Sequence, residues 1–153
     1  MLGSLADRFP FVRDAIRTMA RDKKAHVRMN ALAALPSQRK SLLHEEILSA
    51  ALRDRSARIR ALAADKIMMC GLRSLLSALE ESIAREAMPE LRATLAWERD
   101  LLRDGFCIVD TGNGRVNVTC RVSGGVISTS FSKDEMETKG RQWIKENAVP
   151  GCE

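Results

Sequence analysis

Aromatic side chains are scarce in this sequence, which has four Phe, two Trp and no Tyr in 153 residues. Lectins that stack sugars and proteins that stack single-stranded nucleic acid both need flat aromatic faces, so the composition argues against both classes. Long apolar runs are also missing, because no stretch approaches the roughly 18 to 20 residues of a membrane span. Asp7 and Arg8 stand where the apolar part of a signal peptide would lie. We therefore expect a cytoplasmic protein with no membrane partner.

Histidine and cysteine, which supply many metal and nucleophilic sites, are few. Neither His26 nor His44 has a serine, cysteine or carboxylate at a spacing that would build a nucleophile pair or a metal site. The four cysteines are separated by 37, 13 and 32 residues, which does not fit the closely spaced pairs of zinc sites. We predict reduced thiols, no metal, no cofactor, no small-molecule substrate and no enzymatic activity.

Positive charge is concentrated at the start of the chain. Residues 1–60 carry 13 basic and 6 acidic residues, a net charge of +7, whereas residues 61–104 carry 6 basic and 8 acidic residues, a net charge of −2. Residues 105–153 carry 6 of each sign. An evenly solvated surface would not produce this asymmetry, which indicates an acidic partner for the first part of the chain.

A repeat of 32 residues organises the first hundred positions. Three apolar-arginine pairs keep this spacing: Val27-Arg28, Ile59-Arg60 and Leu91-Arg92. An acid stands six residues before each arginine: Asp22, Asp54 and Glu86. Upstream rows of apolar residues keep the same step, as one stripe of a helix would. The pattern predicts helices over residues 7–21, 25–35, 40–53, 57–69, 72–85 and 89–103.

An acid, five intervening residues and an arginine preceded by an apolar residue together resemble the HEAT repeat. The resemblance covers about residues 7–103, and it lacks the proline often found within the first helix of each HEAT hairpin. It implies three helical hairpins stacked as a short right-handed solenoid. It also implies a structural ladder between neighbouring hairpins, formed by Asp22, Arg28, Asp54, Arg60, Glu86 and Arg92. Stacked repeats of this kind expose extended surfaces that hold partners.

Residues 105–153 predict a different structure, a three-stranded antiparallel meander with one packed helix. Alternating apolar residues mark strands at 106–110, 115–122 and 126–131, and Asn113-Gly114 and Gly124-Gly125 are candidate two-residue turns. This register would place Cys107 opposite Cys120, Val109 opposite Val118, Val122 opposite Ile127 and Val118 opposite Phe131, all on one face. The whole chain is thus predicted to be α+β, with a helical repeat domain at 1–104 and a cap domain at 105–153.

The last helix should begin after Ser132, which forms a capping box with Glu135, and should pack Trp143 on Val118 and Val122. The other face of the sheet would meet water or hold a peptide, and it carries Asn117, Thr119, Arg121, Ser128 and Ser130. The thiols of Cys107 and Cys120 are expected to be reduced, with a disulfide as the less favoured alternative.

The 32-residue register also aligns basic residues in the turns between paired helices. We name this set the basic ridge: Arg21, Lys23, Lys24, His26, Arg53, Arg55, Arg58 and Arg85. The third repeat replaces two of these positions by Ala87 and Glu90, so the ridge is confined to one end. We interpret it as the binding surface of an adaptor or inhibitor with an acidic protein partner. The alternative functional hypothesis is nucleic-acid binding without sequence readout, and the structural alternative is a solvated edge.

Overall fold

The computed structural model of the chain describes residues 9–36, 41–123 and 125–149. Its helical part contains α2 (Pro10–Ala20), α3 (Ala25–Ala34), α4 (Leu42–Ala51), α5 (Ala57–Cys70), a short 3₁₀ turn η1 (Arg73–Leu75), α6 (Leu76–Arg85) and α7 (Pro89–Asp104). Its second part contains β1 (Phe106–Asp110), β2 (Arg115–Val122), β3 (Gly125–Ser132), α8 (Lys133–Glu135), a π turn η2 (Met136–Gly140) and α9 (Arg141–Asn147). The α+β class predicted from the sequence is confirmed.

Local sequence explains where the helices begin and end. Pro10 and Pro89 occupy the first turns of α2 and α7, where an amide donor has no partner within the helix. Gly71 and Gly105 end α5 and α7 in the left-handed region, with φ of 66° and 81°. Glycine adopts this conformation without a β-carbon clash, so both helices end in the way that glycine favours.

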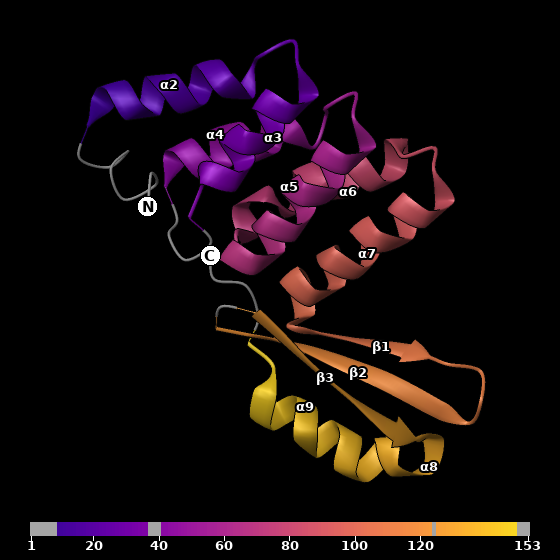
Figure 1. Cartoon of the computed structure of the whole chain (residues 1–153). Helices are drawn as coiled ribbons and strands as arrows, with labels where there is room; N and C mark the ends of the chain where they lie inside the picture. Colours follow the sequence, from indigo (N-terminus) through magenta and orange to yellow (C-terminus); the bar gives the residue numbers. More distant parts are fainter. Residues whose placement is uncertain (1–8, 37–40, 124, 150–153) are drawn as a thin grey trace.

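Helices pair along the chain, α2 with α3, α4 with α5 and α6 with α7, and the second helices α3, α5 and α7 contact one another in series (Figure 1). Between them lies one apolar core that includes the fully buried Leu32, Leu48, Ile59, Ile67, Leu79 and Leu95. The repeat positions Ile59 and Leu91 are buried, at 1% and 8% exposure, while Val27 is half-buried. The right-handed solenoid and the two-domain division stay predictions.

The three strands form an antiparallel meander in the order β1-β2-β3, but the predicted register is wrong. Cys107 pairs with Thr119, not Cys120, because the first turn spans Gly112, Asn113 and Gly114, with positive φ at both glycines. A displacement of one residue turns every side chain of β1 to the other face, so Cys107 and Val109 lie opposite to where they were predicted.

The pairing of β3 with β2 is displaced by two residues from the predicted register, so each side chain stays on its predicted face of the sheet. Val122 pairs with Gly125 and Cys120 pairs with Ile127, whereas the sequence predicted Val122 opposite Ile127. Val118 pairs with Thr129, not Phe131. An even displacement leaves Val118, Cys120 and Ile127 on the same side of the sheet, so the apolar face of β2 and β3 was predicted correctly although the individual pairs were not.

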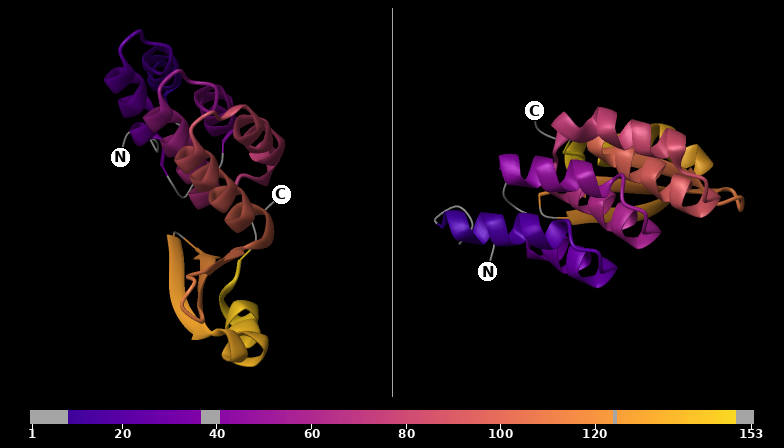
Figure 2. Two further views of the ribbon diagram at one scale, coloured as in Figure 1. Left: turned by 90° about the vertical axis from the view of Figure 1, so that its right-hand side faces the viewer. Right: turned by 90° about the horizontal axis from the view of Figure 1, so that it is seen from above.

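The C-terminal helical segment packs against the meander at the far end of the molecule from α2 (Figure 2). The capping box is confirmed: the Glu135 amide donates to Ser132 Oγ over 3.2 Å, and the Ser132 amide donates to Glu135 Oε2 over 3.2 Å. Trp143 is partly buried and its ring meets Phe131 edge-on at 6.2 Å. The contacts predicted for this ring with Val118 and Val122 stay predictions.

The polar face of the sheet is not uniformly wet, which corrects the sequence prediction. Asn117 and Ser128 are exposed and Ser130 is half-buried, but Thr119 and Arg121 are buried, at 8% and 6% exposure. The sequence analysis assumed water on this face because the side chains are polar.

Arg121 is buried because it joins the sheet to the helical part. Its Nε donates to the Met68 carbonyl over 2.7 Å, and its Nη1 donates to the Val149 carbonyl over 3.0 Å. A β-carbon at residue 71 would overlap the guanidinium group, so Gly71 makes room for it. Because Arg121 of β2 donates to the Met68 carbonyl near the end of α5, it fixes where the sheet attaches to the helical part.

Candidate functional site

The predicted ladder residues form two ion pairs between successive hairpins. Arg28 donates from Nε to Asp54 Oδ2 over 2.6 Å and from Nη2 to Asp54 Oδ1 over 2.8 Å. The guanidinium of Arg60 makes the equivalent contact, with Nε 2.8 Å and Nη2 2.7 Å from Glu86 Oε2. Both acids are almost buried, so these are the charge-assisted, directional pairs that hold a geometry.

The ladder also fixes the turns within each hairpin. Arg28 Nη1 donates to the Asp22 carbonyl over 2.8 Å, and Arg60 Nη1 donates to the Asp54 carbonyl over 2.8 Å. Arg92 repeats this contact with the Glu86 carbonyl, through Nε at 2.8 Å and Nη2 at 2.6 Å. Each arginine therefore holds the turn just before its own helix.

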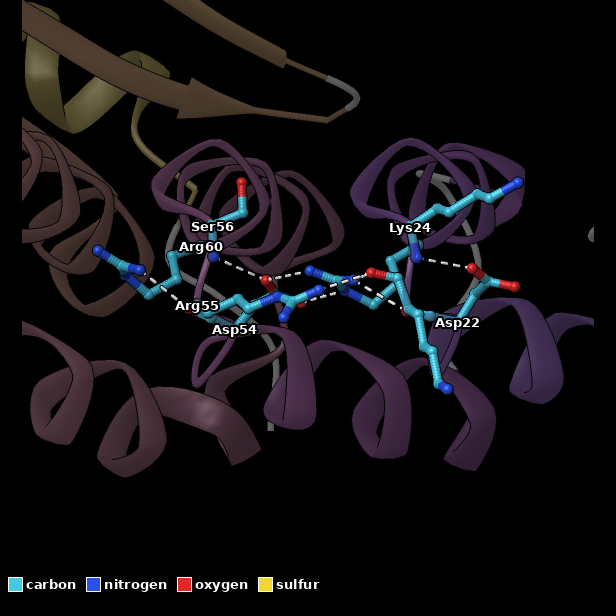
Figure 3. Close-up of polar contacts among 8 residues, drawn as sticks. Asp22, Lys24, Asp54, Arg55, Ser56 and Arg60 are labelled. Atoms are coloured by element: carbon cyan, nitrogen blue, oxygen red, sulfur yellow. Dashed lines mark hydrogen bonds and ion pairs between the residues drawn. The ribbon is translucent and has the colours of Figure 1, made fainter.

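Each acid completes the turn by accepting from the backbone amide two residues ahead. Asp22 Oδ1 accepts from Lys24 over 2.7 Å and Asp54 Oδ1 accepts from Ser56 over 2.8 Å (Figure 3), and Glu86 Oε1 accepts from Met88 over 3.0 Å. The Arg28 guanidinium lowers the pKa of Asp54. The pKa of Glu86 is lowered first by the Met88 amide and then by Arg60. The carboxylates are thus stabilised in their charged form.

Three arginines of the basic ridge face acidic side chains. Arg21 lies 3.5 Å from Glu46, and Arg53 and Arg85 lie 3.1 and 3.6 Å from the same oxygen of Glu81. These pairs are solvent-exposed and weak, but they reduce the positive potential near the three arginines.

The remaining ridge residues lie in or just after the first two turns, and His26 and Arg58, which the sequence analysis placed in turns, belong to the first turns of helices α3 and α5. Arg55 Nη2 donates to the Lys23 carbonyl over 2.6 Å, which joins the turn of the second hairpin to that of the first (Figure 3). The side chains of Lys23, Lys24 and Arg58 and the ring of His26 are exposed, and within the described part of the chain none of them lies within 4 Å of a carboxylate. An open hollow of about 610 Å³ adjoins these turns, lined by Arg17, Thr18, Arg21, Asp22, Lys23 and Lys24.

The histidines and thiols have structural surroundings. His44 is buried, with Nδ1 2.8 Å from Ser41 Oγ and Nε2 2.9 Å from the Pro36 carbonyl. Cys107 and Cys120 are both thiols, and burial raises the pKa of each, which reduces their nucleophilicity. Cys152 lies outside the described residues. Over residues 9–36, 41–123 and 125–149, no group of three or more His, Cys, Asp or Glu residues could hold a metal ion.

The sequence analysis missed an acidic pair on the second helices. Glu98 of α7 is buried, at 5% exposure, and its Oε2 lacks a hydrogen-bond partner in the part of the chain that the structure describes. Asp65 of α5 lies near enough to raise the pKa of Glu98 further, although burial is the larger cause of the shift to about 8. The 32-residue register could have drawn attention to this row, since it aligns Ala34, Lys66 and Glu98, but it could not show which side chains are buried.

In the described ranges, no helix combines the length and the apolarity needed to cross a membrane. The chain matches no protein-family model, no curated protein and no solved structure. Its function is therefore inferred from the residues and contacts of the chain itself.

Proposed function

We propose that this protein is a non-catalytic adaptor or inhibitor that binds an acidic protein partner along the basic ridge. The observation that carries the proposal is the way in which the ladder fixes the ridge. One guanidinium, that of Arg28, binds the carbonyls of Asp22 and Lys23 and the carboxylate of Asp54. The exposed ammonium groups therefore project from a preorganised turn. Because the turn is already ordered, this protein loses little conformational entropy when a partner binds.

An acidic partner is favoured by the confinement of unpaired cations to one end. Lys23 and Lys24 project from the first turn and Arg58 projects from the start of α5, whereas Ala87 follows the acid of the third turn. Positive charge at one end of an elongated surface orients an incoming acidic protein and raises the association rate. We expect the ridge to bind the surface of another protein, because it consists of exposed side chains beside an open hollow.

The proposal includes membership of the HEAT-repeat family and a cytoplasmic location. Membership of the HEAT-repeat family is supported by the ladder, in which the arginine of one hairpin donates hydrogen bonds to the acid of the next. The proposed cytoplasmic location is consistent with Cys107 and Cys120, which form no disulfide in the described part of the chain.

The test compares two charge-reversal variants of equal net charge. The ridge variant carries Lys23→Glu and Lys24→Glu, and Arg55 is retained because its guanidinium holds the Lys23 carbonyl. The control carries Arg13→Glu and Lys145→Glu, both exposed and outside the ridge. Affinity capture from host extract, with quantitative mass spectrometry, should recover an acidic protein with wild type and the control and at least tenfold less with the ridge variant.

Nuclease treatment and competition with duplex DNA distinguish the two partner classes. An acidic protein partner should remain bound after nuclease treatment. If nuclease treatment abolishes the capture and added duplex DNA binds the ridge, with an affinity that falls with salt at a slope near −0.9 per phosphate contacted, the partner is nucleic acid. Equal capture by the ridge and control variants would mean that the ridge is a solvated edge, and would overturn the proposal.

A further inference from the structure

A groove runs across the second helices, on a surface that includes only one residue of the basic ridge. It has a volume of about 420 Å³ and is lined by Met29 of α3, by Arg58, Ala61, Leu62 and Asp65 of α5, and by Thr94 and Glu98 of α7. The α5 residues follow the spacing i, i+3, i+4 and i+7, so they form one stripe along the helix. Arg58 stands at one end of this stripe and Asp65 at the other, about 10 Å apart for seven residues of helix.

Glu98 is the unusual residue of the groove, because nothing in the described fold satisfies it. Its Oε2 is buried and accepts no hydrogen bond from any residue that the structure describes. The equivalent position one repeat earlier is Lys66, which is also buried but donates from Nζ to the Leu35 carbonyl over 2.9 Å. The fold thus completes the polar contact of this row in the second hairpin and leaves it incomplete in the third.

When Glu98 is ionised, its missing partner must be a donor, and the setting favours a cationic one. A carboxylate only accepts hydrogen bonds, and Asp65 beside it adds a second negative charge instead of a donor. Two carboxylates are too few for a metal site of protein ligands, whereas an ammonium or guanidinium group can be bound by both.

Apolar residues line the approach to the two carboxylates. Met29, Ala61 and Leu62 are all partly buried and offer carbon atoms instead of hydrogen-bonding groups. Lysine and arginine side chains place their methylene groups on such surfaces while the charged end reaches a polar partner. A free metal ion would leave this apolar stretch uncovered, and the second ammonium group of a polyamine would face the like charge of Arg58.

We propose that this groove binds a lysine or arginine side chain of a protein partner, with its methylene groups on Met29, Ala61 and Leu62 and its charged group on the Glu98 and Asp65 carboxylates. The same segment would place an acidic side chain toward Arg58, about two helical turns away. The groove therefore requires a partner segment with charges of both signs, which the ridge alone does not.

Binding is coupled to the ionisation of Glu98. Burial and Asp65 raise its pKa to about 8, so the carboxyl is protonated at neutral pH and must lose the proton to bind a cation. The other charged groups that line the groove are Arg58 and Asp65, both on α5. Helix α3 contributes only the uncharged Met29, and no described residue of α6, β1 or β2 lines the groove. Affinity for a cation should rise with pH until Glu98 is ionised.

The experiment uses the whole chain with methyl-labelled methionine and small probes of the two side chains. n-Butylguanidinium and n-butylammonium carry the charge, and n-butylurea is the neutral control of similar shape. At pH 9, the Met29 methyl resonance should shift and saturate with both cations and not with n-butylurea. The affinity for n-butylguanidinium should be roughly thirtyfold weaker at pH 6.5 than at pH 9, because the proton then competes for Glu98.

Two glutamine variants make the test specific. Glu98→Gln should weaken binding of n-butylguanidinium at least tenfold at pH 9, while Glu90→Gln, at an exposed position of α7, should leave it unchanged. An unchanged Met29 resonance in the free Glu98→Gln variant shows that the groove is intact. Equal binding of n-butylurea, or equal affinity of the Glu98→Gln variant, would overturn the proposal. The ridge variant reverses Lys23 and Lys24, neither of which lines the groove, so failure here is separable from failure of the ridge proposal.

Discussion

Replacing Glu98 by glutamine should stabilise the protein in alkaline solution and leave it almost unchanged in acid. The unfolded chain ionises this carboxyl near its ordinary pKa of 4.5, whereas burial, with a contribution from Asp65, raises the pKa in the folded protein to about 8. Below pH 4.5 both states hold the proton. Between pH 4.5 and 8 only the folded state holds it, so the free energy of unfolding falls as pH rises, and above pH 8 the loss is complete.

The magnitude follows from the two pKa values. Each unit of difference corresponds to about 1.4 kcal/mol, so the wild type should lose about 4 to 5 kcal/mol between pH 4 and pH 9 through this carboxyl. Glutamine has nearly the same shape and does not ionise. The difference in free energy of unfolding between the Glu98→Gln variant and wild type should therefore be near zero at pH 4 and grow to several kcal/mol at pH 9.

The assay is urea unfolding at a series of pH values, followed by the fluorescence of Trp97 and Trp143. Both rings are partly buried in the folded protein, so their emission should change on unfolding. The matched control is Glu90→Gln, which should differ from wild type by less than about 0.5 kcal/mol at every pH, because that side chain is exposed. A Glu98→Gln variant no more stable than wild type at pH 9 would refute the reasoning, since it would mean that the folded protein hydrates or pairs this carboxylate.

Three further substitutions test the core, the sheet attachment and the ladder. Ile59→Ala should lower the free energy of unfolding by about 2 to 5 kcal/mol in urea titration, because the side chain is fully buried; a loss below about 0.5 kcal/mol would place the core elsewhere. Gly71→Ala should raise the unfolding rate and lower the free energy of unfolding by more than Gly112→Ala does. Both glycines have positive φ, but only a β-carbon at residue 71 would overlap Arg121. Equal losses of stability would mean that Arg121 does not fix the attachment of the sheet. Asp54→Asn should cost about 3 kcal/mol at pH 7, because it leaves Arg28 without its buried counter-charge. The pKa of Asp54 is lowered in the fold, so this difference should begin to shrink as the pH falls below about 4 and should disappear only below the lowered pKa. A difference that does not shrink in acid would contradict the ion-pair explanation.

Local patterns in the sequence were sufficient for the helical elements, whereas the ladder residues came from the resemblance to the HEAT repeat. The 32-residue spacing of apolar-arginine pairs predicted six helical segments, and Gly71, Pro89 and Gly105 mark observed helix ends. These signals are local, because a proline or glycine restricts or frees its own backbone whatever packs around it. The capping box before α8 is local in the same sense.

Strand register depended on a choice that the residues left open. Gly112, Asn113 and Gly114 are compatible with a two-residue or a three-residue turn, and the two differ by one position in every pair. The register depends on how the meander packs against α7 and α9. The alternation of apolar and polar residues alone therefore could not show which face of the sheet carries Cys107.

The acidic groove and the Arg121 contact were decided by tertiary structure alone. Glu98 and Arg121 are charged residues in amphipathic elements, and their types predict exposure. Packing of α7 on α5 buries Glu98 beside Asp65, and the position of β2 against the end of α5 gives Arg121 the Met68 carbonyl. The sequence by itself determined which residues lie on one helix and recur between repeats. Which of its charged groups lose water was determined only by the approach of segments 30 or more residues apart, because burial depends on atoms that no local pattern contains.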